Sequence, residues 1–197
     1  MSCVAVIPAR GGSRRIPNKN RREFRGKPII AYSIEAAQAS GLFDHVVVST
    51  DDHQIAEIAY IHGAWALPRS PELSRDEIGT QDVTRSVILE IMKHGIKPMY
   101  ACCIYPCAPL LNPVHLIQAS EAVRRKGILY AVSVGSWLRD PGQFYFGRVA
   151  AFLTNAPLLD SHTFMIPIGA DRDCDINTES DWSRAEAMYA ALHPEAA

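Results

Sequence analysis

The chain opens with a short hydrophobic run that passes directly into a basic, glycine-containing loop, and this junction constrains the fold most. Residues 4–8 read Val-Ala-Val-Ile-Pro, a run typical of a buried parallel strand. Residues 9–21 then combine two adjacent glycines with five cations: Arg10, Arg14, Arg15, Lys19 and Arg21. Paired glycines let the backbone turn its N–H groups toward a ligand, and the surrounding cations favour a polyphosphate. Such a loop belongs at the carboxyl edge of an open α/β sheet.

The better-known phosphate loops do not match this one. The loop lacks the Gly-Lys-Ser/Thr ending of the Walker motif, and it lacks the three spaced glycines of the dinucleotide fingerprint. Instead, Pro17, Asn18 and Asn20 keep the chain irregular up to about Pro28. A basic loop can also be a solvated surface, so both interpretations stay open, but glycines directly behind a first strand favour a phosphate site.

The overall composition is typical of one globular domain. The chain has 197 residues, of which 48% are hydrophobic and 21% charged, and it can bury a core without disulfides. We therefore expect a single domain over residues 1–197. The net charge is −1, so the basic character is confined to the first loop. This argues against nucleic-acid binding, which uses a broad basic face, and suits a small polyanion.

Cysteine use and the first residues predict a cytoplasmic protein. The five cysteines are odd in number and do not have the spacing of a zinc site: Cys3, Cys102, Cys103, Cys107 and Cys174. A reducing compartment is the simplest setting for them. The first residues lack the layout of a signal peptide, and the apolar runs are too short to span a membrane, so no membrane partner is expected.

Strand and helix signals alternate along most of the chain. The residue patterns predict strands at 4–8, 45–49, 64–67, 99–104 and 129–134, and helices at 28–39, 51–62, 80–91, 113–125 and 179–192. This alternation predicts a three-layer α/β fold with a mostly parallel sheet that helices cover on both faces. Residues 142–152 are expected to form an extended ribbon.

Polar segments follow several of these strands, where ligands of such sheets bind. Residues 49–52 (Ser-Thr-Asp-Asp) either cap the next helix or serve a functional role, and the sequence favours neither. Residues 68–80 form a long irregular stretch that can line a pocket. Residues 105–109 (Tyr-Pro-Cys-Ala-Pro) form a rigid turn that can shape a base or sugar pocket.

An acidic segment precedes the last helix. In an extended chain Asp173, Asp175 and Asn177 share one face, and clustered oxygen ligands suit a hard cation such as Mg²⁺. The alternative is an acidic turn that caps the final helix through Thr178. Together with the cationic loop, the segment suggests a nucleotide–metal site in which catalysis consists largely of positioning and charge neutralisation.

Several of these motifs together resemble one family. Residues 7–20, 26–34 and 48–52 resemble the acylneuraminate cytidylyltransferases, which make CMP-sialic acids. Residues 103–109, 142–145 and 175–178 are most similar to the branch that uses pseudaminic acid. The resemblance covers nearly the whole chain. It implies a Rossmann-like, nucleotide-diphospho-sugar transferase type of fold and a homodimer.

The resemblance also implies a reaction. With Mg²⁺ bound, the anomeric hydroxyl of a nonulosonic acid attacks the α-phosphate of CTP, CMP-sugar forms and pyrophosphate leaves. Arg10 and Lys19 would be catalytic, because they would offset charge on the leaving pyrophosphate. The implied nucleotide-binding residues are Ala9, Arg10, Gly11, Gly12, Ser13, Lys19, Asn20, Arg69, Asp76 and Thr80. Tyr105 and Gln143 would shape the sugar pocket, and Asp175 and Asn177 would bind the metal.

The chain departs from the family pattern at three places. Asn177 replaces an aspartate, and Cys107 stands where the family favours threonine. Relatives also carry a longer stretch, with sugar-binding cations and a dimerisation hairpin, where this chain has a shortened segment near 135–142. The leading hypothesis is therefore a pseudaminic acid cytidylyltransferase. The alternative is a CTP-binding homologue with impaired or no catalysis. A small-molecule kinase or oxidoreductase is disfavoured because their glycine motifs are missing.

Overall fold

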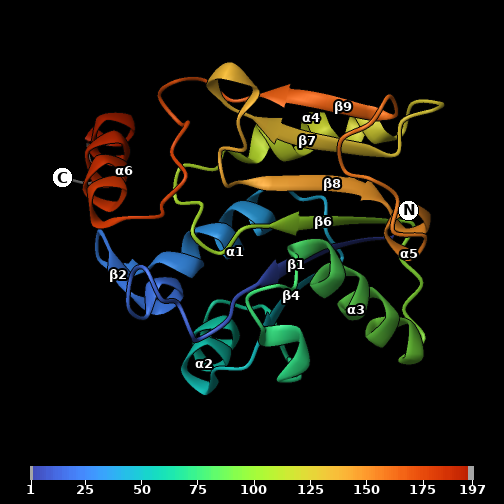
Figure 1. Cartoon of the computed structure of the whole chain (residues 1–197), viewed down its shortest axis with the longest axis horizontal. Helices are drawn as coiled ribbons and strands as arrows, with labels where there is room; N and C mark the ends of the chain where they lie inside the picture. Colours follow the sequence, from blue (N-terminus) through green and yellow to red (C-terminus); the bar gives the residue numbers. More distant parts are fainter. Residues whose placement is uncertain (1, 195–197) are drawn as a thin grey trace.

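The computed structural model describes residues 2–194 and contains one seven-stranded sheet (Figure 1). In sheet order, its strands are β5 (Trp65–Pro68), β4 (His45–Thr50), β1 (Cys3–Pro8), β6 (Tyr100–Ile104), β8 (Phe144–Arg148), β7 (Tyr130–Val134) and β9 (Thr163–Pro167). A two-stranded hairpin pairs β2 (Glu23–Phe24) with β3 (Lys27–Pro28). Four of the pairings in the large sheet are parallel, and only the two that involve β8 are antiparallel. The predicted mostly parallel sheet is confirmed.

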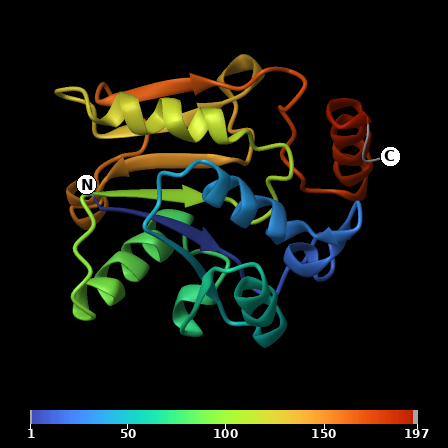
Figure 2. The ribbon, with the colours of Figure 1, turned by 180° about the vertical axis from the view of Figure 1, so that it is seen from behind.

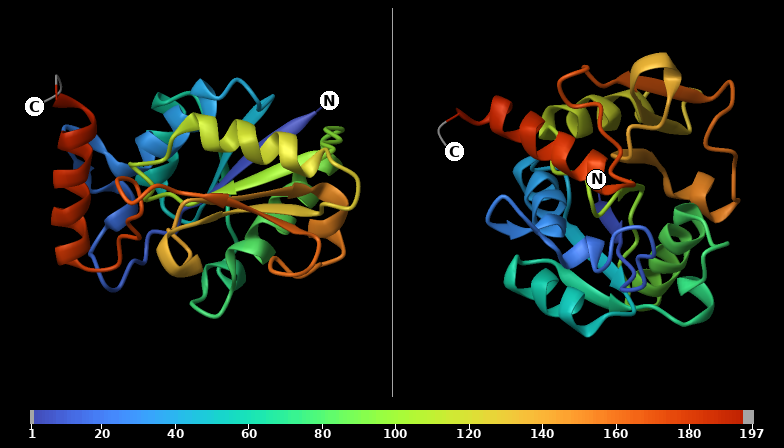
Figure 3. Two further views of the ribbon diagram at one scale, coloured as in Figure 1. Left: turned by 90° about the horizontal axis from the view of Figure 1, so that it is seen from above. Right: turned by 60° about the vertical axis from the view of Figure 1, so that its left-hand side comes forward.

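Helices cover both faces of the sheet, which makes the fold three-layered. They are α1 (Ile29–Ala39), α2 (His53–Ile61), α3 (Thr80–Lys93), α4 (Pro113–Val123), α5 (Val149–Leu153) and α6 (Glu179–Leu192). Short 3₁₀ turns occur at Lys19–Arg21, Glu72–Ser74 and Ser136–Leu138. Figure 2 shows α1 and α4 on one face, and Figure 3 shows α4 and α3 on opposite sides of the strands.

The central strand β1 shows why the layers form. Every residue of β1 is buried, because side chains of both faces pack under helices. Ala5 and Ile7 join the cluster formed with α1, α2 and α4. Val4 and Val6 join the cluster formed with α3 and α5. The carboxyl end of β1 is therefore fixed from both sides, which gives the loop that follows a rigid base.

A third cluster places the last helix beside the first loop. Trp182 of α6 packs edge to face on Phe24 of the β2–β3 hairpin, with ring centroids 5.5 Å apart. Thr178 and Asp181 form a capping box at the start of α6, so the expected cap through Thr178 is confirmed. The strands of the parallel sheet point toward the side of the molecule where α6 lies (Figure 1). The acidic segment before α6 is thus brought to the ligand-binding edge.

The prediction for residues 142–152 is only partly right. Strand β8 ends at Arg148, and residues 149–153 form the helix α5 instead of a continued ribbon. The turn into the helix buries Phe152, whose ring lies 5.2 Å from that of Tyr130 in an edge-to-face contact. This tertiary contact, together with two alanines, favours a helix over an extended chain.

Two strand pairs were missed by the sequence analysis. The hairpin β2–β3 has only two residues in each strand, too few for a periodic pattern. Strand β9 lies at the edge of the sheet and pairs with β7 alone, and only Ile166 of its five residues is buried. Within residues 2–194, no helix combines the length and apolarity needed to cross a membrane.

Candidate functional site

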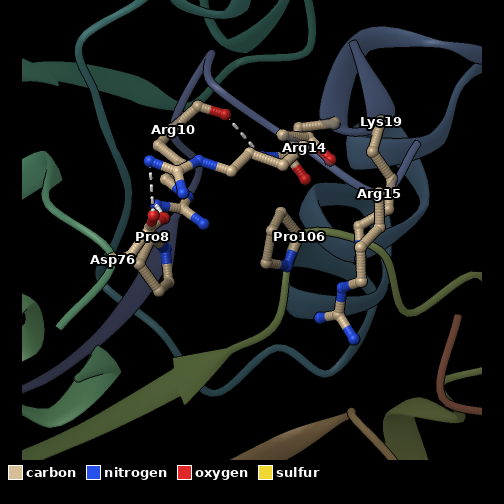
Figure 4. Close-up of a pocket in the computed structure, with 9 residues that line it drawn as sticks. Pro8, Arg10, Arg14, Arg15, Lys19, Asp76 and Pro106 are labelled. Carbon is tan, nitrogen blue, oxygen red and sulfur yellow. Dashed lines mark hydrogen bonds and ion pairs between the residues drawn. The ribbon is translucent and has the colours of Figure 1, made fainter. Parts of the chain in front are cut away.

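A polar cavity of about 350 Å³ lies at the carboxyl end of β1. Its lining comes from the first loop, the loop before α3 and the turn after β6: Pro8, Arg10, Ser13, Arg14, Arg15, Lys19, Asn20, Asp76 and Pro106. Figure 4 shows Arg10, Arg14 and Asp76 together on one side of Pro106, with Arg15 and Lys19 on the other. The loop cations thus converge on one space, as a phosphate site requires.

A carboxylate already pairs with two of these cations. Asp76 forms ion pairs with the guanidinium groups of Arg10 and Arg14, the second at 2.8 Å. The hydrogen bond from Arg10 lowers the pKa of Asp76, so the carboxylate keeps its charge. Asp76 therefore occupies the place on Arg10 where the oxygen of a phosphate can bind.

Lys19 links the cavity to the acidic segment. Its Nζ atom donates a hydrogen bond of 2.7 Å to the backbone carbonyl of Ile176. Ile176 stands between Asp175 and Asn177, the two expected metal ligands. The positively charged loop and the oxygen ligands are therefore neighbours, although 157 residues separate Lys19 from Ile176.

The first glycine of the pair is occupied by a contact within the protein. The N–H of Gly11 donates to Oδ1 of Asp51 at 2.8 Å, and so is not presented to a ligand. A side chain on Gly11 would come within 2.7 Å of Oδ2 of Asp52, whereas Gly12 has open space. Only glycine fits at position 11 without a shift, because the segment after β4 lies too close for a side chain. Ala9, Gly11 and Gly12 are not among the residues that line the cavity.

The Ser49–Asp52 segment provides the helix cap, which is one of the two roles that the sequence left open. Asp52 caps α2 by accepting from the backbone N–H of Gln54 at 2.8 Å. Asp51 holds Gly11, as described above, and this role was not predicted. Its signal in the sequence was its place directly after a buried strand.

The loop before α3 forms a second wall. Arg69, Asp76 and Thr80, which the resemblance gives as nucleotide-binding residues, line a smaller cavity of about 200 Å³ together with Arg10. Burial lowers the pKa of Arg69, although nearby Asp51 opposes this effect. The guanidinium of Arg69 donates to the carbonyl oxygen of Ser49 at 2.5 Å, which ties this loop to the end of β4. Arg69 is therefore held in place before any ligand arrives.

The expected sugar-binding residues lie at neighbouring strand ends: Tyr105 directly follows β6, and Gln143 directly precedes β8. The hydroxyl of Tyr105 donates to Oδ2 of Asp140 at 2.9 Å, and the backbone N–H of Tyr105 donates to the carbonyl of Gln143 at 2.8 Å. The Gln143 side chain is only 2% exposed, and its Nε2 atom donates to the carbonyl of Arg172. Among the residues described, its Oε1 atom has no hydrogen-bond partner. Tyr105 and Gln143 are therefore neighbours, and Tyr105 has the more accessible side chain.

Tyr105 opens onto a largely apolar cavity of about 150 Å³. Its remaining lining is Val132, Ser133, Val134, Leu138, Asp140, Phe144, Tyr145, Leu158 and Leu159. The shortened segment forms one rim as a tight turn, in which Asp173 accepts from the N–H of Ser136 at 2.8 Å. Trp137 and Leu138 both adopt left-handed backbone conformations there, and Trp137 is 93% exposed. No sequence signal had pointed to Asp140 as a residue of this site.

The acidic segment does not present three ligands on one face. The Asp173 carboxylate accepts a hydrogen bond from the backbone N–H of Ser136, whereas the Asn177 amide donates to the carboxylate of Asp175. Among residues 2–194, no group of three or more histidine, cysteine, aspartate or glutamate side chains could hold a metal. Magnesium needs only one or two protein oxygens when substrate phosphates and water complete its shell. Asp175 and Asn177, next to the cationic cavity, fit that requirement.

The fold and this site together define a class of protein: an α/β protein with a mostly parallel sheet and a cation-lined cavity at the end of its first strand. The sequence pattern of the family described as cytidylyltransferase matches residues 4–146. The chain is also 33% identical to a pseudaminic acid cytidylyltransferase of Campylobacter jejuni, and the alignment covers 100% of both chains. The chain therefore belongs to the cytidylyltransferase family.

Two further comparisons agree with this assignment. A CMP-N,N'-diacetyllegionaminic acid synthase of Legionella pneumophila is 38% identical over 135 residues, which are 68% of this chain and 55% of that protein. The structure of CMP:2-keto-3-deoxy-manno-octonic acid synthetase complexed with CTP superposes with a TM-score of 0.76 at 17% identity, covering 98% of this chain and 100% of that one. The second likeness establishes the shared fold, and the nucleotide-diphospho-sugar transferase type expected from the sequence is confirmed.

Proposed function

We propose that this protein transfers CMP from CTP to the anomeric hydroxyl of a nonulosonic acid, with pseudaminic acid as the expected acceptor. The main support for this proposal is that four loop cations line one cavity at the end of β1 in a chain of the cytidylyltransferase family: Arg10, Arg14, Arg15 and Lys19. Full-length similarity to a pseudaminic acid cytidylyltransferase supports the choice of acceptor. The whole chain, residues 1–197, would act as one nucleotidyltransferase domain.

The cationic cavity suits the triphosphate of CTP. The acceptor's hydroxyl oxygen forms a new bond to the α-phosphorus while the bond from that phosphorus to the oxygen it shares with the β-phosphate breaks. The hydroxyl proton passes to water, and negative charge develops on the departing pyrophosphate. Arg10 and Lys19 carry fixed positive charge at this cavity and can stabilise that charge. Binding of the triphosphate would displace Asp76 from Arg10, and Asp76 would then be free to contact the rest of the nucleotide.

The metal would be held by Asp175 and Asn177. One carboxylate and one amide oxygen would bind Mg²⁺, and the ion would neutralise phosphate charge when bound. Lys19 keeps this segment next to the phosphate cavity through the carbonyl of Ile176. Because Asn177 replaces a carboxylate by a neutral amide, the set of metal ligands carries one negative charge fewer.

The apolar cavity beside Tyr105 would receive the acceptor. Its lining suits the acyl and deoxy groups of a nonulosonic acid, while the Tyr105 hydroxyl can exchange Asp140 for a polar group of the sugar. The alignment with the Campylobacter protein spans 231 positions, 34 more than the 197 residues of this chain. This difference supports a shortened acceptor region and is the reason why the homodimer stays a prediction. A cytoplasmic location fits the five buried free cysteines.

A panel of acceptors tests the proposal. Purified protein is incubated with CTP, Mg²⁺ and pseudaminic, legionaminic or N-acetylneuraminic acid, and pyrophosphate release is measured. We expect Mg²⁺-dependent release with pseudaminic acid, and little release when UTP replaces CTP. Calorimetric titration with CTP is run in parallel. Binding without turnover on any acceptor would favour the impaired homologue, and failure to bind CTP would overturn both versions.

A further inference from the structure

A buried cysteine outside the expected site lies directly against the phosphate loop. Cys107, in the turn after β6, is 7% exposed, and its Sγ atom lies 3.1 Å from Oδ1 of Asn20. The same Asn20 side chain, 6% exposed, donates from Nδ2 to the backbone carbonyl of Arg10 at 2.8 Å. The Asn20 amide therefore bridges the turn after β6 and the backbone of a cavity-lining arginine.

The two contacts define which way the amide points. An amide has one accepting and one donating end, and the carbonyl of Arg10 can only accept, so Nδ2 must face it. The other end then needs a donor, and the only polar hydrogen of the Cys107 side chain can meet that need. Burial raises the pKa of Cys107 to about 12, so the sulfur keeps its proton at neutral pH and can donate.

The surroundings explain why this contact matters for the site. Lys19 lowers and Asp175 raises the pKa of Cys107, although both influences are smaller than burial. The sulfur is therefore within electrostatic reach of both the phosphate-binding lysine and the expected metal ligand. Without a donor at this place, the Oδ1 atom of Asn20 would be buried and unpaired, or the amide would turn and lose Arg10.

We propose that Cys107 is a positioning residue for CTP binding: its thiol orients the Asn20 amide, which in turn fixes the backbone of Arg10 in the phosphate loop. This inference rests on the proposed function for its effect on CTP, but not for its effect on the loop. A cysteine that acts only by filling space would be replaceable by any side chain of similar volume.

Two substitutions of similar volume separate orientation from packing. Cys107→Thr keeps a hydroxyl donor, and Cys107→Val removes the donor while keeping the shape. Calorimetric titration with CTP and Mg²⁺ should give a dissociation constant about threefold to tenfold weaker for Cys107→Val, the range of one lost hydrogen bond, and Cys107→Thr should bind like the wild type. Cys3→Val, the same change at the far end of β1, is the control and should bind CTP normally.

A double-mutant cycle with Asn20→Ala tests the route of the effect. If Cys107 acts through the amide, Cys107→Val should weaken CTP binding no further once the Asn20 side chain is gone. Equal weakening in both backgrounds, or a Cys107→Thr variant as weak as Cys107→Val, would contradict the inference and leave only packing.

Hydrogen exchange keeps the test independent of the nucleotide. Without any ligand, backbone amides of residues 9–21 should exchange faster in Cys107→Val than in the wild type, while β4 and α3 remain unchanged. If the wild-type protein failed to bind CTP but this difference were present, the proposed function would be wrong and the positioning role would stand. Unchanged exchange in the loop would overturn the positioning role whatever the affinity for CTP.

Discussion

The two cavities at the carboxyl edge of the sheet differ in the chemistry of their linings. The first, about 350 Å³, has four cations of one loop among its lining residues. The second, about 150 Å³, is lined mostly by aliphatic and aromatic side chains and rimmed by a short turn with two left-handed residues. We refer to these, after their proposed roles, as the phosphate cavity and the acceptor cavity. Thr80, the first residue of α3, lies between them: it lines the cavity of about 200 Å³ together with Arg10, and it accepts a hydrogen bond of 3.1 Å from Tyr145 of the second cavity.

The difference shows how such an enzyme can keep one substrate and change another. Several hydrogen bonds fix the loop that forms the phosphate cavity. Asp51 accepts from the N–H of Gly11, Asn20 donates to the carbonyl of Arg10, and the carbonyl of Ile176 accepts from Lys19. The rim of the acceptor cavity is a seven-residue connection that is held by exposed hydrogen bonds near its two ends, between Ser136 and Asp173 and between Asp140 and Tyr105. The names of the two relatives differ in the sugar acid, while each is a CMP-sugar enzyme or a cytidylyltransferase. Variation of the acceptor is expected where the chain is least constrained.

Removing a cation from the phosphate cavity should have the largest effect. We expect Arg10→Ala to lower kcat/KM for CTP by about 100-fold or more, the range found when a group that stabilises transition-state charge is removed. The melting temperature should change by no more than a few degrees, because Arg10 lies in a loop and adds little to the core. Pyrophosphate release and thermal melting are the measurements. Arg85→Ala, on the exposed side of α3, is the control. An unfolded variant or undiminished turnover would refute the role of Arg10.

A change behind the cavity should have a smaller effect, and the chain offers a matched pair. Gly11→Ala places a methyl group 2.7 Å from Oδ2 of Asp52, so the loop must move away from β4. We expect CTP binding to weaken by about tenfold, comparable to the loss of a charged hydrogen bond. Gly12→Ala meets nothing within 4 Å and should bind CTP like the wild type. Equal affinities of the two variants would show that the contact with β4 does not position the loop.

The sequence predicted the local features of the site but not its long-range contacts. The strand before the loop, the helix cap at Asp52 and the final capping box were predictable because each depends on residues close in the chain. The pairing of Asp76 with Arg10 joins positions 66 residues apart, and no local pattern encodes it. The resemblance to a family supplied Asp76 as a site residue, but only the structure shows that it faces the cations.

The sequence patterns gave wrong predictions for two segments whose conformation depends on tertiary contacts. The ribbon expected over 142–152 overlooked α5, because the burial of Phe152 against Tyr130 cannot be inferred from neighbouring residues. The expected shared face of the acidic segment overlooked the turn at Ser136, which withdraws Asp173. Such errors concentrate in the last third of the chain, where regular alternation of strands and helices ends.

A change in the acceptor cavity should act on the other substrate alone. Leu138→Asn removes an apolar side chain from the rim while keeping a residue that tolerates the positive φ of 56°. Leu138 is exposed in the free protein, so the loss concerns the apolar surface that a bound sugar acid would cover. We expect the KM for the sugar acid to rise about fivefold and the KM for CTP to stay the same. Leu89→Ser on α3 is the control. A rise in the KM for CTP instead would mean that the two cavities are not separate sites.

The smallest change is expected at the metal ligand that differs from the family pattern. Asn177→Asp replaces the amide that donates to Asp175 with a second carboxylate. Two carboxylates repel each other without a cation and attract a divalent ion more strongly, so the variant should need less Mg²⁺ for half-maximal activity. At saturating Mg²⁺ its turnover should equal or exceed that of the wild type by up to about threefold, because only one charge in the ligand set changes. Asn155→Asp, in an exposed turn, is the control. A clear loss of activity at saturating Mg²⁺ would show that residue 177 does not bind the metal, and Asp175 would then need a different partner.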